Sequence, residues 1–538
     1  MDCQINSISI KETGYFSKLV NDYVTENRSQ LASFYKYEPN DVGLKAAVAA
    51  RLESFSIDRD TLVTVLKEQY ASLTTDQKVL NNIELLADEK TVTICTAHQP
   101  NLMTGHLYTF YKIIHTVTLA DYLKSILPDY NFVPVFYVGS EDNDLEELGN
   151  FHYEGREYVW NTTQEGAVGR MKTDDLKSLI ADLFRVLGPN NENTQHVKQL
   201  ILDAYQSGHS IATATRMMIN DLLGYLGVVT IDPDDARLKA NYTNIIRTEI
   251  FEPIAYEMVA QTSNALNAAG YKAQAHTRTI NFFYLKDQIR NRIEHIDADT
   301  FEVVNTDIRF TKSEMEAEIA QYPERFSPNV ILRGLYQETI LPNVAFIGGG
   351  SEVAYWMQLK PVFEHYNVFY PAIILRQSVM ITNDYAEDLR KKLGLSIPQQ
   401  FIKTDPLIDQ YVSEHTANEL NLSEQQLVLS NMMESITQQV TAVDKNLANS
   451  AQAALTKMKH QFEILEKKIF RAEKRNQSVA VERIHRLKES IFPNDGLQER
   501  HDNFLSYYIQ NGRAMFDALH QHTAPFGDKF LILQFPQH

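Results

Sequence analysis

An acidic run, Glu141-Asp142-Asn143-Asp144, directly follows a continuous apolar stretch at residues 132–138. Clustered carboxylates can hold the amine of a substrate, bind a cation or act as a general base. A solvated acidic loop is the alternative, because the chain has a net charge of −18. The position of the run, immediately after a segment with the pattern of a buried strand, favours a functional role for Glu141, Asp142 and Asp144.

A second candidate is the loop that contains His98, Gln99 and the tripeptide Thr104-Gly105-His106. A β-branched run precedes it and apolar residues recur at helical spacing after it, which predicts a strand, a loop and a helix. The first amides of such a helix lack intrahelical partners and lie at the positive end of the helix dipole, so the loop could hold a phosphate. His106 could donate a hydrogen bond to that phosphate in a transition state, whereas helix capping would be a sufficient explanation for Thr104.

Three consecutive glycines, Gly348, Gly349 and Gly350, precede a helical stretch that carries Glu352 and Tyr355. Glycine permits close backbone approach and a positive φ. A tight turn would explain one or two of these glycines, so three in a row suggest that a ligand passes near. Other predicted strand or loop ends carry cations that could contact phosphates or carboxylates, although each alone is more often a surface or ion-pair residue: Lys112, Arg333 and Arg376.

These candidates fall between apolar, β-rich runs that alternate with helical segments. Such alternation predicts an α/β, Rossmann-like core with a parallel sheet covered on both faces. Ligands of such sheets bind outside the carboxyl ends of the strands, where the candidate loops lie. The predicted strands are residues 91–96, 132–138, 227–231, 280–285, 344–347 and 368–375.

The pattern of the chain predicts four regions. Residues 1–90 form a helical segment packed on the core, and 91–384 form the Rossmann-like core with insertions. Residues 385–495 form a helical, coiled-coil extension, and 496–538 return to the core with a helix and the sequence FLILQF, a possible edge strand.

The predicted coiled coil rests on apolar residues that recur every three or four positions between Met433 and Ala472, without Pro or Gly. Consecutive gaps of four at Leu447, Ala451 and Leu455 resemble a stutter. One long helix is the direct interpretation. A reversal around Lys474 would allow residues 479–491 to return as an antiparallel partner, and the seam could also be satisfied by a second subunit.

The overall composition excludes several classes of protein. A chain of 538 residues with a net charge of −18 lacks the basic surface that a nucleic-acid partner requires. Two cysteines, no apparent signal peptide and no apolar run of bilayer length predict a soluble cytoplasmic protein without a membrane partner. Walker, GxGxxG, GxSxG, CxxC and HExxH motifs are absent, so no metal site is predicted.

Taken in order, several segments resemble the cysteine ligase family of bacillithiol biosynthesis. They are TAHQPNLMTGHLYTFYK, VPVFYVGSEDNDLEEL, GVVTIDPDDARLK, SPNVILRGLYQETILPNVAFIGGGSEVAYWMQLKPVFEH and LQER. The resemblance covers nearly the whole chain. It implies a HIGH-type nucleotidyltransferase-like core with a coiled coil that forms homodimers. The implied reaction joins the carboxyl of cysteine to the amine of glucosaminyl malate, with ATP as co-substrate and Mg²⁺ as a possible cofactor.

The resemblance can be carried over residue by residue. Gln99, Pro100, Thr104 and Gly105 match the family's first loop; Glu141, Asp142 and Asp144 match its acidic segment; and Gly348, Gly349, Glu352 and Tyr355 match its glycine-rich segment. The chain departs from the family at four places: it has His98 for Gln, His106 for Pro, Asn143 for His, and Gly350-Ser351 for Pro-Gly.

We therefore predict a catalytic group of His106, Glu141, Asp142 and Asp144. The predicted binding group is His98, Gln99, Thr104, Gly105, Lys112, Arg333, Gly348, Gly349, Gly350, Glu352, Tyr355 and Arg376. Two alternatives stay open. One is a nucleotidyltransferase that releases a nucleotide conjugate, and the other is a non-catalytic coiled-coil dimer whose core binds a ligand.

Overall fold

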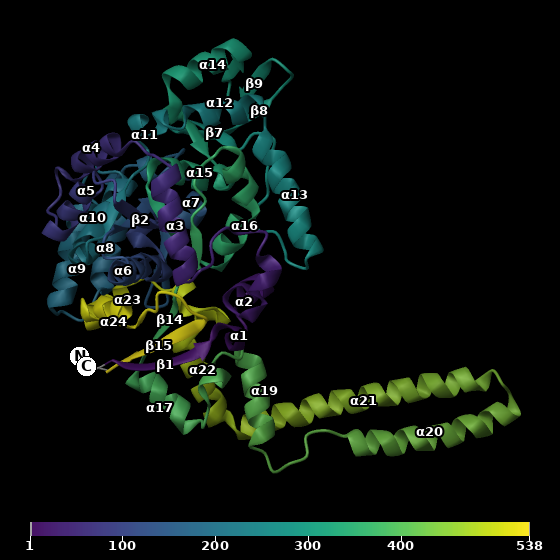
Figure 1. Ribbon diagram of the computed structural model, residues 1–538. Helices are drawn as coiled ribbons and strands as arrows, with labels where there is room; N and C mark the ends of the chain where they lie inside the picture. The colour runs from purple at the N-terminus through teal and green to yellow at the C-terminus, as the bar shows by residue number, and fades with distance from the viewer. Residues whose placement is uncertain (1–2, 537–538) are drawn as a thin grey trace. The chain divides into compact units, whose positions relative to one another are not determined.

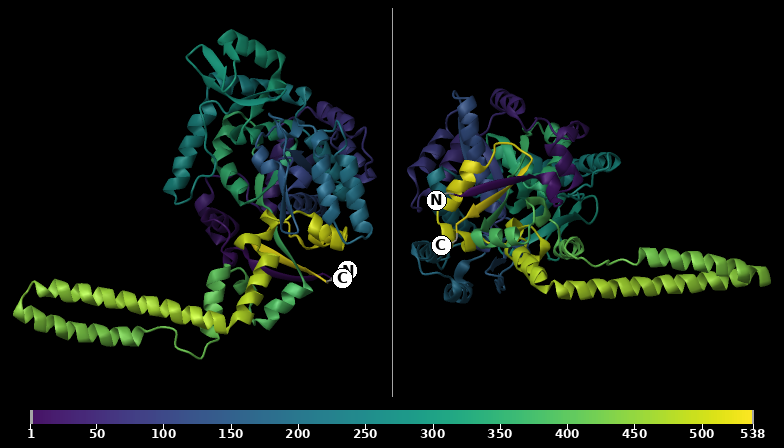
Figure 2. Two further views of the ribbon diagram at one scale, coloured as in Figure 1. Left: turned by 180° about the vertical axis from the view of Figure 1, so that it is seen from behind. Right: turned by 90° about the horizontal axis from the view of Figure 1, so that it is seen from below.

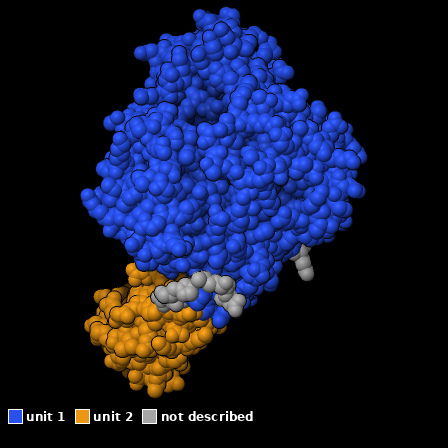
Figure 3. Space-filling view, turned by 90° about the vertical axis from the view of Figure 1, so that its left-hand side faces the viewer, with its two compact units in different colours: residues 1–381, 497–538 blue, residues 382–496 orange. Residues whose placement is uncertain are grey.

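The computed structural model describes residues 3–536, which form two compact units. The first unit contains the chain up to Ile381 and from Leu497 onward, and the second contains Thr382–Gly496 (Figure 3). The chain therefore leaves the first unit at Ile381 and returns to it at Leu497.

A five-stranded sheet forms the centre of the first unit, with the strands in the order β13-β12-β2-β3-β6 and all pairs parallel. The strands are almost entirely buried and rich in apolar and β-branched residues, as parallel strands covered on both faces should be. This sheet confirms the predicted Rossmann-like core. Its strands are β2 Thr91–His98, β3 Asn131–Val138, β6 Val229–Ile231, β12 Asn343–Gly348 and β13 Ala372–Leu375.

Helix α6, Tyr108–Ile126, connects β2 to β3 and is buried along most of its length. Leu119 and Leu123 pack with strand residues in one hydrophobic cluster, whereas Phe110 and Ile114 belong to a second cluster. A helix with apolar residues on all of its faces must be packed against other parts of the protein on all of those faces. The loop between β2 and α6 is therefore anchored at both ends by rigid elements.

The other helices of the first unit surround the sheets (Figure 1). None of the helices within residues 3–536 combines the length and the apolar character needed to cross a membrane. Their bounds are α1 Ile10–Thr13, α2 Lys18–Val24, α3 Asp41–Ser54, α4 Arg59–Tyr70, α5 Gln77–Leu85, α7 Leu145–Leu148, α8 Lys177–Val186, α9 Glu192–Ala204, α10 Ile211–Leu223, α11 Ala236–Ala240, α12 Thr243–Phe251, α13 Ile254–Ala268, α14 Lys312–Gln321, α15 Val330–Ile340, α16 Gly350–His365, α23 Leu505–Asn511 and α24 Ala514–His522.

The strand order reverses between β2 and β12. From β2 the chain adds β3 and then β6 on one side, and later adds β12 and β13 on the other. In open α/β sheets the crevice at such a switch point, outside the carboxyl ends of the strands, is where ligands bind. We call this place, between His98 and Gly348, the switch point.

A separate antiparallel sheet has the order β10-β9-β8-β7-β11. It corrects one prediction, because residues 280–285 supply β7 of this sheet and not a strand of the parallel one. The reason is local: Asp287, at a φ of +49°, and Gln288 form a two-residue turn that folds β8 back on β7.

The strands of this antiparallel sheet are β7 Phe282–Lys286, β8 Ile289–His295, β9 Thr300–Val303, β10 Arg309–Thr311 and β11 Phe326–Pro328. A hairpin of β4 Asn150–Tyr153 and β5 Arg156–Val159 completes the antiparallel elements of this region.

A three-stranded sheet, β1-β15-β14, contains segments from both ends of the chain. β1, Gln4–Ser9, lies in the region predicted to be helical, and β15, Lys529–Phe535, is the central strand and not the predicted edge strand. The third strand is β14, Ser378–Asn383. The partner of β1 lies more than 500 residues away in the sequence, where Gln4 pairs with Gln534, so local patterning could not identify this strand.

The second unit is helical, and two of its helices, α20 and α21, run antiparallel side by side (Figures 1 and 2). The reversal predicted at Lys474 is wrong. Asp444, whose carboxylate accepts a hydrogen bond from the Asn446 amide at 2.8 Å, turns the chain at residues 444–446. Residues 479–491 lie in α22, which contacts α17 and α19. The helices are α17 Asp384–Lys392, α18 Ile397–Gln400, α19 Thr404–Glu414, α20 Ser423–Val443, α21 Leu447–Asn476 and α22 Ser478–Ile491.

Candidate active site

Lys112 projects from α6 to the switch point and is fully buried. Its ammonium group donates a hydrogen bond to the Ala97 carbonyl at 2.9 Å and lies 2.5 Å from a carboxylate oxygen of Glu352, on α16. Burial lowers the pKa of Lys112, although Glu352 opposes that shift. The pair therefore joins the ends of β2 and α16, the two elements on either side of the switch point.

Arg376, directly after β13, is the second buried cation. Its guanidinium donates to both carboxylate oxygens of Glu499 at 2.9 and 2.7 Å, and its backbone amide donates to the Gly348 carbonyl. Burial works against its charge, but Glu499 outweighs that effect and raises the pKa of Arg376. Arg376 Nε is buried without a hydrogen-bond partner among the described residues and lies near Gly349.

Tyr108, in the first turn of α6, lies between the two candidate histidines. Its hydroxyl contacts His98 Nε2 at 3.2 Å, and its ring lies 5.7 Å from that of His106. Lys112 and Arg376 approach the face of the same ring. Burial, together with the surrounding positive charges, lowers the pKa of His98 well below its usual value, so its imidazole is neutral at pH 7.

Arg333, on α15, connects the switch point to the acidic run. It forms a side-chain hydrogen bond with Tyr355 and interacts electrostatically with Asp142. Gln99 Nε2 donates to Asp142 at 3.2 Å. Burial disfavours the charge of Asp142, but Arg290, Arg333 and the Gln99 hydrogen bond outweigh it and lower the pKa of this carboxyl.

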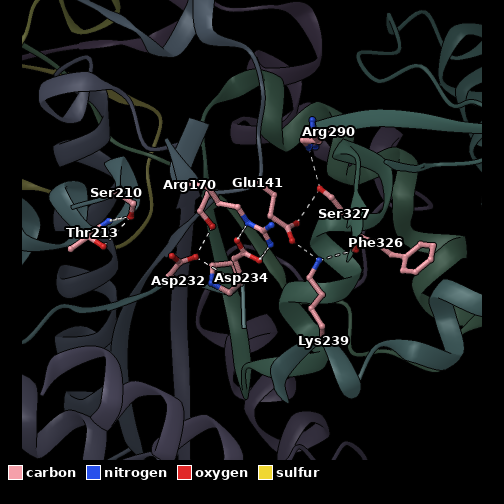
Figure 4. A network of polar contacts seen from close by, with 12 residues as sticks. Glu141, Arg170, Ser210, Thr213, Asp232, Asp234, Lys239, Arg290, Phe326 and Ser327 are labelled. Carbon is pink, nitrogen blue, oxygen red and sulfur yellow. Dashed lines mark hydrogen bonds and ion pairs between the residues drawn. The ribbon is translucent and has the colours of Figure 1, made fainter. Parts of the chain in front are cut away.

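The three carboxylates of the acidic run have different surroundings. Glu141 is buried, lies 2.6 Å from Lys239 Nζ and accepts a hydrogen bond from Ser327 (Figure 4). Asp142 is partly exposed beside Arg290 and Gln99. Asp144 caps α7 by accepting a hydrogen bond from the Glu147 amide at 3.1 Å. Only Asp142 therefore combines access with contacts to other candidate residues.

A further acidic pair lies beside this run, after β6 (Figure 4). Asp234 accepts two hydrogen bonds from Arg170 at 2.6 and 2.7 Å, and Asp232 accepts one from Ser140 at 2.5 Å. Burial and the neighbouring Asp234 raise the pKa of Asp232 to about 6. These contacts hold the β3 and β6 loops together.

The loop at residues 101–107 is held by the C-terminal segment. Asn503 donates hydrogen bonds to the carbonyls of Met103 and Gly105 at 2.9 and 2.6 Å, and the Leu107 amide donates to the Asp502 carbonyl at 2.9 Å. Thr104, at a φ of +65°, bonds to the Met103 carbonyl and does not cap α6, which corrects the capping explanation.

Gly105 and His106 have structural surroundings in this loop. Gly105 has a φ of +71°, and a Cβ there would lie 2.7 Å from the Asn101 side chain, so both conformation and space require glycine. Burial lowers the pKa of His106, which lies close to His152 and His501. The structure thus brings His98 to the switch point, whereas His106 belongs to the packing around the C-terminal segment.

The glycine-rich segment begins α16. The Gly349 amide donates to Glu352 at 2.8 Å. A Cβ at Gly348 would lie 2.9 Å from the Phe346 ring, and one at Gly350 would lie 3.0 Å from Val20. None of the three has a positive φ, so close packing explains Gly348 and Gly350, and Gly349 is the one that faces Glu352 and Arg376.

Sequence reasoning missed five residues that contact the candidates: Tyr108, Lys239, Arg290, Glu499 and Asn503. Arg290 lies beyond the predicted strand at residues 280–285 and outside every quoted segment. Tyr108, Lys239 and Glu499 each lie in a segment that carried part of the family resemblance, and that was the feature that could have identified them.

Two family models together match nearly the whole chain. The family model described as "Bacillithiol biosynthesis BshC, N-terminal Rossmann-like domain" matches residues 3–377, and "Bacillithiol biosynthesis BshC, C-terminal coiled-coil domain" matches residues 379–535. Relatives named "Putative cysteine ligase BshC" are similar over nearly their full length. That of Flavobacterium johnsoniae is 36% identical over 98% of this chain and 99% of its own, and that of Cytophaga hutchinsonii is 37% identical over 97% of each. That of Salinibacter ruber is 31% identical over 94% of each. The chain belongs to the BshC family of bacillithiol biosynthesis, as its sequence motifs predicted.

Proposed function

We propose that this protein is an ATP-dependent ligase that joins the carboxyl of cysteine to the amine of glucosaminyl malate to give bacillithiol. The names of its relatives support the ligase reaction. The observation that carries the ATP-dependent part is the group of three cations around the switch point: Lys112 and Arg376, which are buried, and Arg333, which is half-buried. Preorganised positive charge at such a place stabilises the charge that develops in phosphoryl and acyl transfer.

The reaction would proceed in two steps. A carboxylate oxygen of cysteine attacks the α-phosphorus of ATP, and the bond to pyrophosphate breaks. The amine of glucosaminyl malate then attacks the acyl carbon, AMP departs, and the nitrogen loses a proton. Lys112, Arg333 and Arg376 would neutralise the phosphates and AMP as they depart. Magnesium would be held through the phosphates of the nucleotide, because residues 3–536 offer no cluster of three metal-ligating side chains.

Within this proposal Asp142 positions the attacking amine, since it is the accessible carboxylate next to Gln99 and Arg333. Neutral His98, in contact with Tyr108, can accept the proton that the amine releases. Glu141 holds Lys239 and thereby fixes the acidic run. Asp144 and His106 act through the structure of their loops.

The test is incubation of the purified full-length chain with ATP, cysteine and glucosaminyl malate, with mass spectrometry of the products. Bacillithiol, AMP and pyrophosphate are expected. A nucleotide conjugate without amide formation would identify a nucleotidyltransferase instead. In cells, loss of the gene should abolish bacillithiol and cause glucosaminyl malate to accumulate; unchanged levels of both would refute the physiological role.

We also propose a cytoplasmic homodimer formed through the coiled coil, with no nucleic-acid or membrane partner. Helices α20 and α21 leave several large apolar side chains exposed, which a second copy could cover: Leu427, Val428, Met432, Ile436, Val443, Leu447, Met458 and Leu465. Light scattering on the full-length chain should give twice the monomer mass. The double variant Leu427→Lys, Val443→Lys should give the mass of the monomer.

A further inference from the structure

A polar cavity of about 200 Å³ lies beside the acidic run, on the antiparallel sheet. Its lining includes two arginines, Arg290 and Arg292, and three asparagines, Asn143, Asn291 and Asn305. No aspartate or glutamate contributes to the lining. Such a cavity offers positive charge and amide donors, which suit an anionic ligand with several oxygen atoms.

Arg290 is held rigidly at this cavity and is only 7% exposed. Its Nε donates to Ser327 at 3.1 Å, its Nη1 donates to Asn143 at 2.8 Å, and its guanidinium lies 4.1 Å from the centre of the Phe283 ring. Asn143 donates back to the Arg290 carbonyl at 3.1 Å. These contacts fix the guanidinium in one orientation before any ligand binds, which lowers the entropic cost of binding.

Arg292 lies two residues further along β8, so it points to the same face of the sheet as Arg290. It is partly exposed and pairs with Glu294 at 2.7 Å. An anion in the cavity would share this guanidinium with Glu294. The two arginines therefore provide an inner, buried cation and an outer, accessible one.

Arg290 also connects the cavity to the candidate active site. It borders a second, much smaller cavity that is lined by Gly139, Asp142 and Arg333. Asp142 lies 3.8 Å from Arg290 Nη1 and accepts the hydrogen bond from Gln99. A ligand whose carboxylates lie on Arg290 and Arg292 would therefore reach toward Asp142 with its other end.

We propose that this cavity binds the two carboxylates of a dicarboxylate, the malyl group of the acceptor substrate. The inference rests on the proposed function, in which the amine at the other end of that substrate is positioned by Asp142. Two cations match two carboxylates, and the asparagine amides can donate to the oxygen that links the malyl group to the sugar. This site would select the acceptor by its acidic group, apart from the place where ATP and cysteine react.

The test uses full-length protein and calorimetric titration with L-malate alone, with its neutral diamide and with inorganic phosphate. L-malate should bind, and the diamide should not. Arg292→Gln should weaken L-malate binding about tenfold or more, because a hydrogen bond to a charged group is lost. Arg309→Gln is the matched control, because Arg309 is exposed on β10, the edge strand of the same sheet, and does not line the cavity; it should leave the affinity unchanged. Arg290→Lys, with its thermal unfolding measured alongside, should also weaken binding.

The outcomes separate the site from the function. Absence of L-malate binding by the wild-type protein, equal effects of Arg292→Gln and Arg309→Gln, or phosphate binding as tight as malate binding would overturn the dicarboxylate site. If L-malate binds as expected but no bacillithiol forms, the site stands and the proposed ligase fails. If Arg292→Gln forms bacillithiol with an unchanged KM for glucosaminyl malate, the ligase stands and the site fails.

Discussion

Glu499→Gln should destabilise the first unit by about 3–5 kcal/mol, the usual cost of leaving a buried charge without its partner. Glu499 is fully buried and accepts four hydrogen bonds: two from Arg376 and one each from the Ser378 hydroxyl and the Val379 amide. Glutamine removes the negative charge and turns an amide donor toward a guanidinium that can only donate. Arg376, which is 4% exposed, then keeps its charge in the interior without its carboxylate partner.

Urea unfolding followed by tryptophan fluorescence measures this loss directly. Both tryptophans of the chain, Trp160 and Trp356, are buried in the first unit, so the emission does not report on residues 382–496. Glu316→Gln, which breaks an exposed pair with Arg247, is the control and should cost less than about 1 kcal/mol.

A double variant completes this test. Arg376→Met combined with Glu499→Leu should recover most of the stability, because no buried charge remains. If Glu499→Gln costs no more than Glu316→Gln, or if the double variant is less stable than the single one, the pair does not carry the charge balance inferred here.

Lys112→Met should lower kcat/KM for bacillithiol formation by about 10²–10³-fold, as expected for loss of a preorganised charge. Lys360→Met, which breaks the pair with Glu364 on α16, is the control and should leave kcat/KM unchanged. Equal effects of the two substitutions would exclude a specific role for Lys112. His98→Asn should reduce kcat more than His106→Asn, because only His98 lies at the switch point; the reverse order would return the catalytic role to His106. Burial raises the pKa of Glu338 to about 7. The folded state therefore binds this proton more tightly than the unfolded state, and the free energy of unfolding should fall by about 3 kcal/mol between about pH 4.3 and pH 7. Urea titrations at pH 5 and pH 8 measure this change in the free energy of unfolding, and Glu338→Gln should remove the part that Glu338 contributes. An identical pH dependence of variant and wild type would contradict the raised pKa of Glu338.

The sequence predicted those parts of the fold that depend on local patterning. The strands β2, β3 and β12 are continuous buried runs, and each is followed by a helix, so periodicity located them and their shared edge. Local patterning failed where distant segments pair. β1 finds its partner at the other end of the chain, and the apolar period of α20 continues into α21 across the turn at Asp444, so neither feature has a distinct local pattern.

The candidate site was predictable to the same extent. Residues that end parallel strands, such as His98 and Arg376, could be placed at one edge of the sheet from strand order alone. The different surroundings of Asp142 and Asp144 could not be predicted from the sequence, because they depend on which carboxylate caps a helix and which one accepts a hydrogen bond from Gln99. Arg290 comes from a different sheet, and only the tertiary fold brings it to the acidic run.

The site depends on a segment that no strand-to-helix loop of the Rossmann-like core provides. Residues 497–504, with which the chain returns to the first unit, hold Arg376 through Glu499 and the loop after β2 through Asn503. In the same segment, Gln498 accepts a hydrogen bond from the Ile381 amide and donates one to the Ile381 carbonyl, at 2.8 and 2.9 Å, at the residue where the chain leaves this unit. The points of departure and return are thus joined beside the residues that carry the charge of the site. This gives LQER a structural role in the candidate site although it lies far from the core in sequence: the edge of the sheet that holds the candidate residues is complete only after the chain has passed through residues 382–496 and come back.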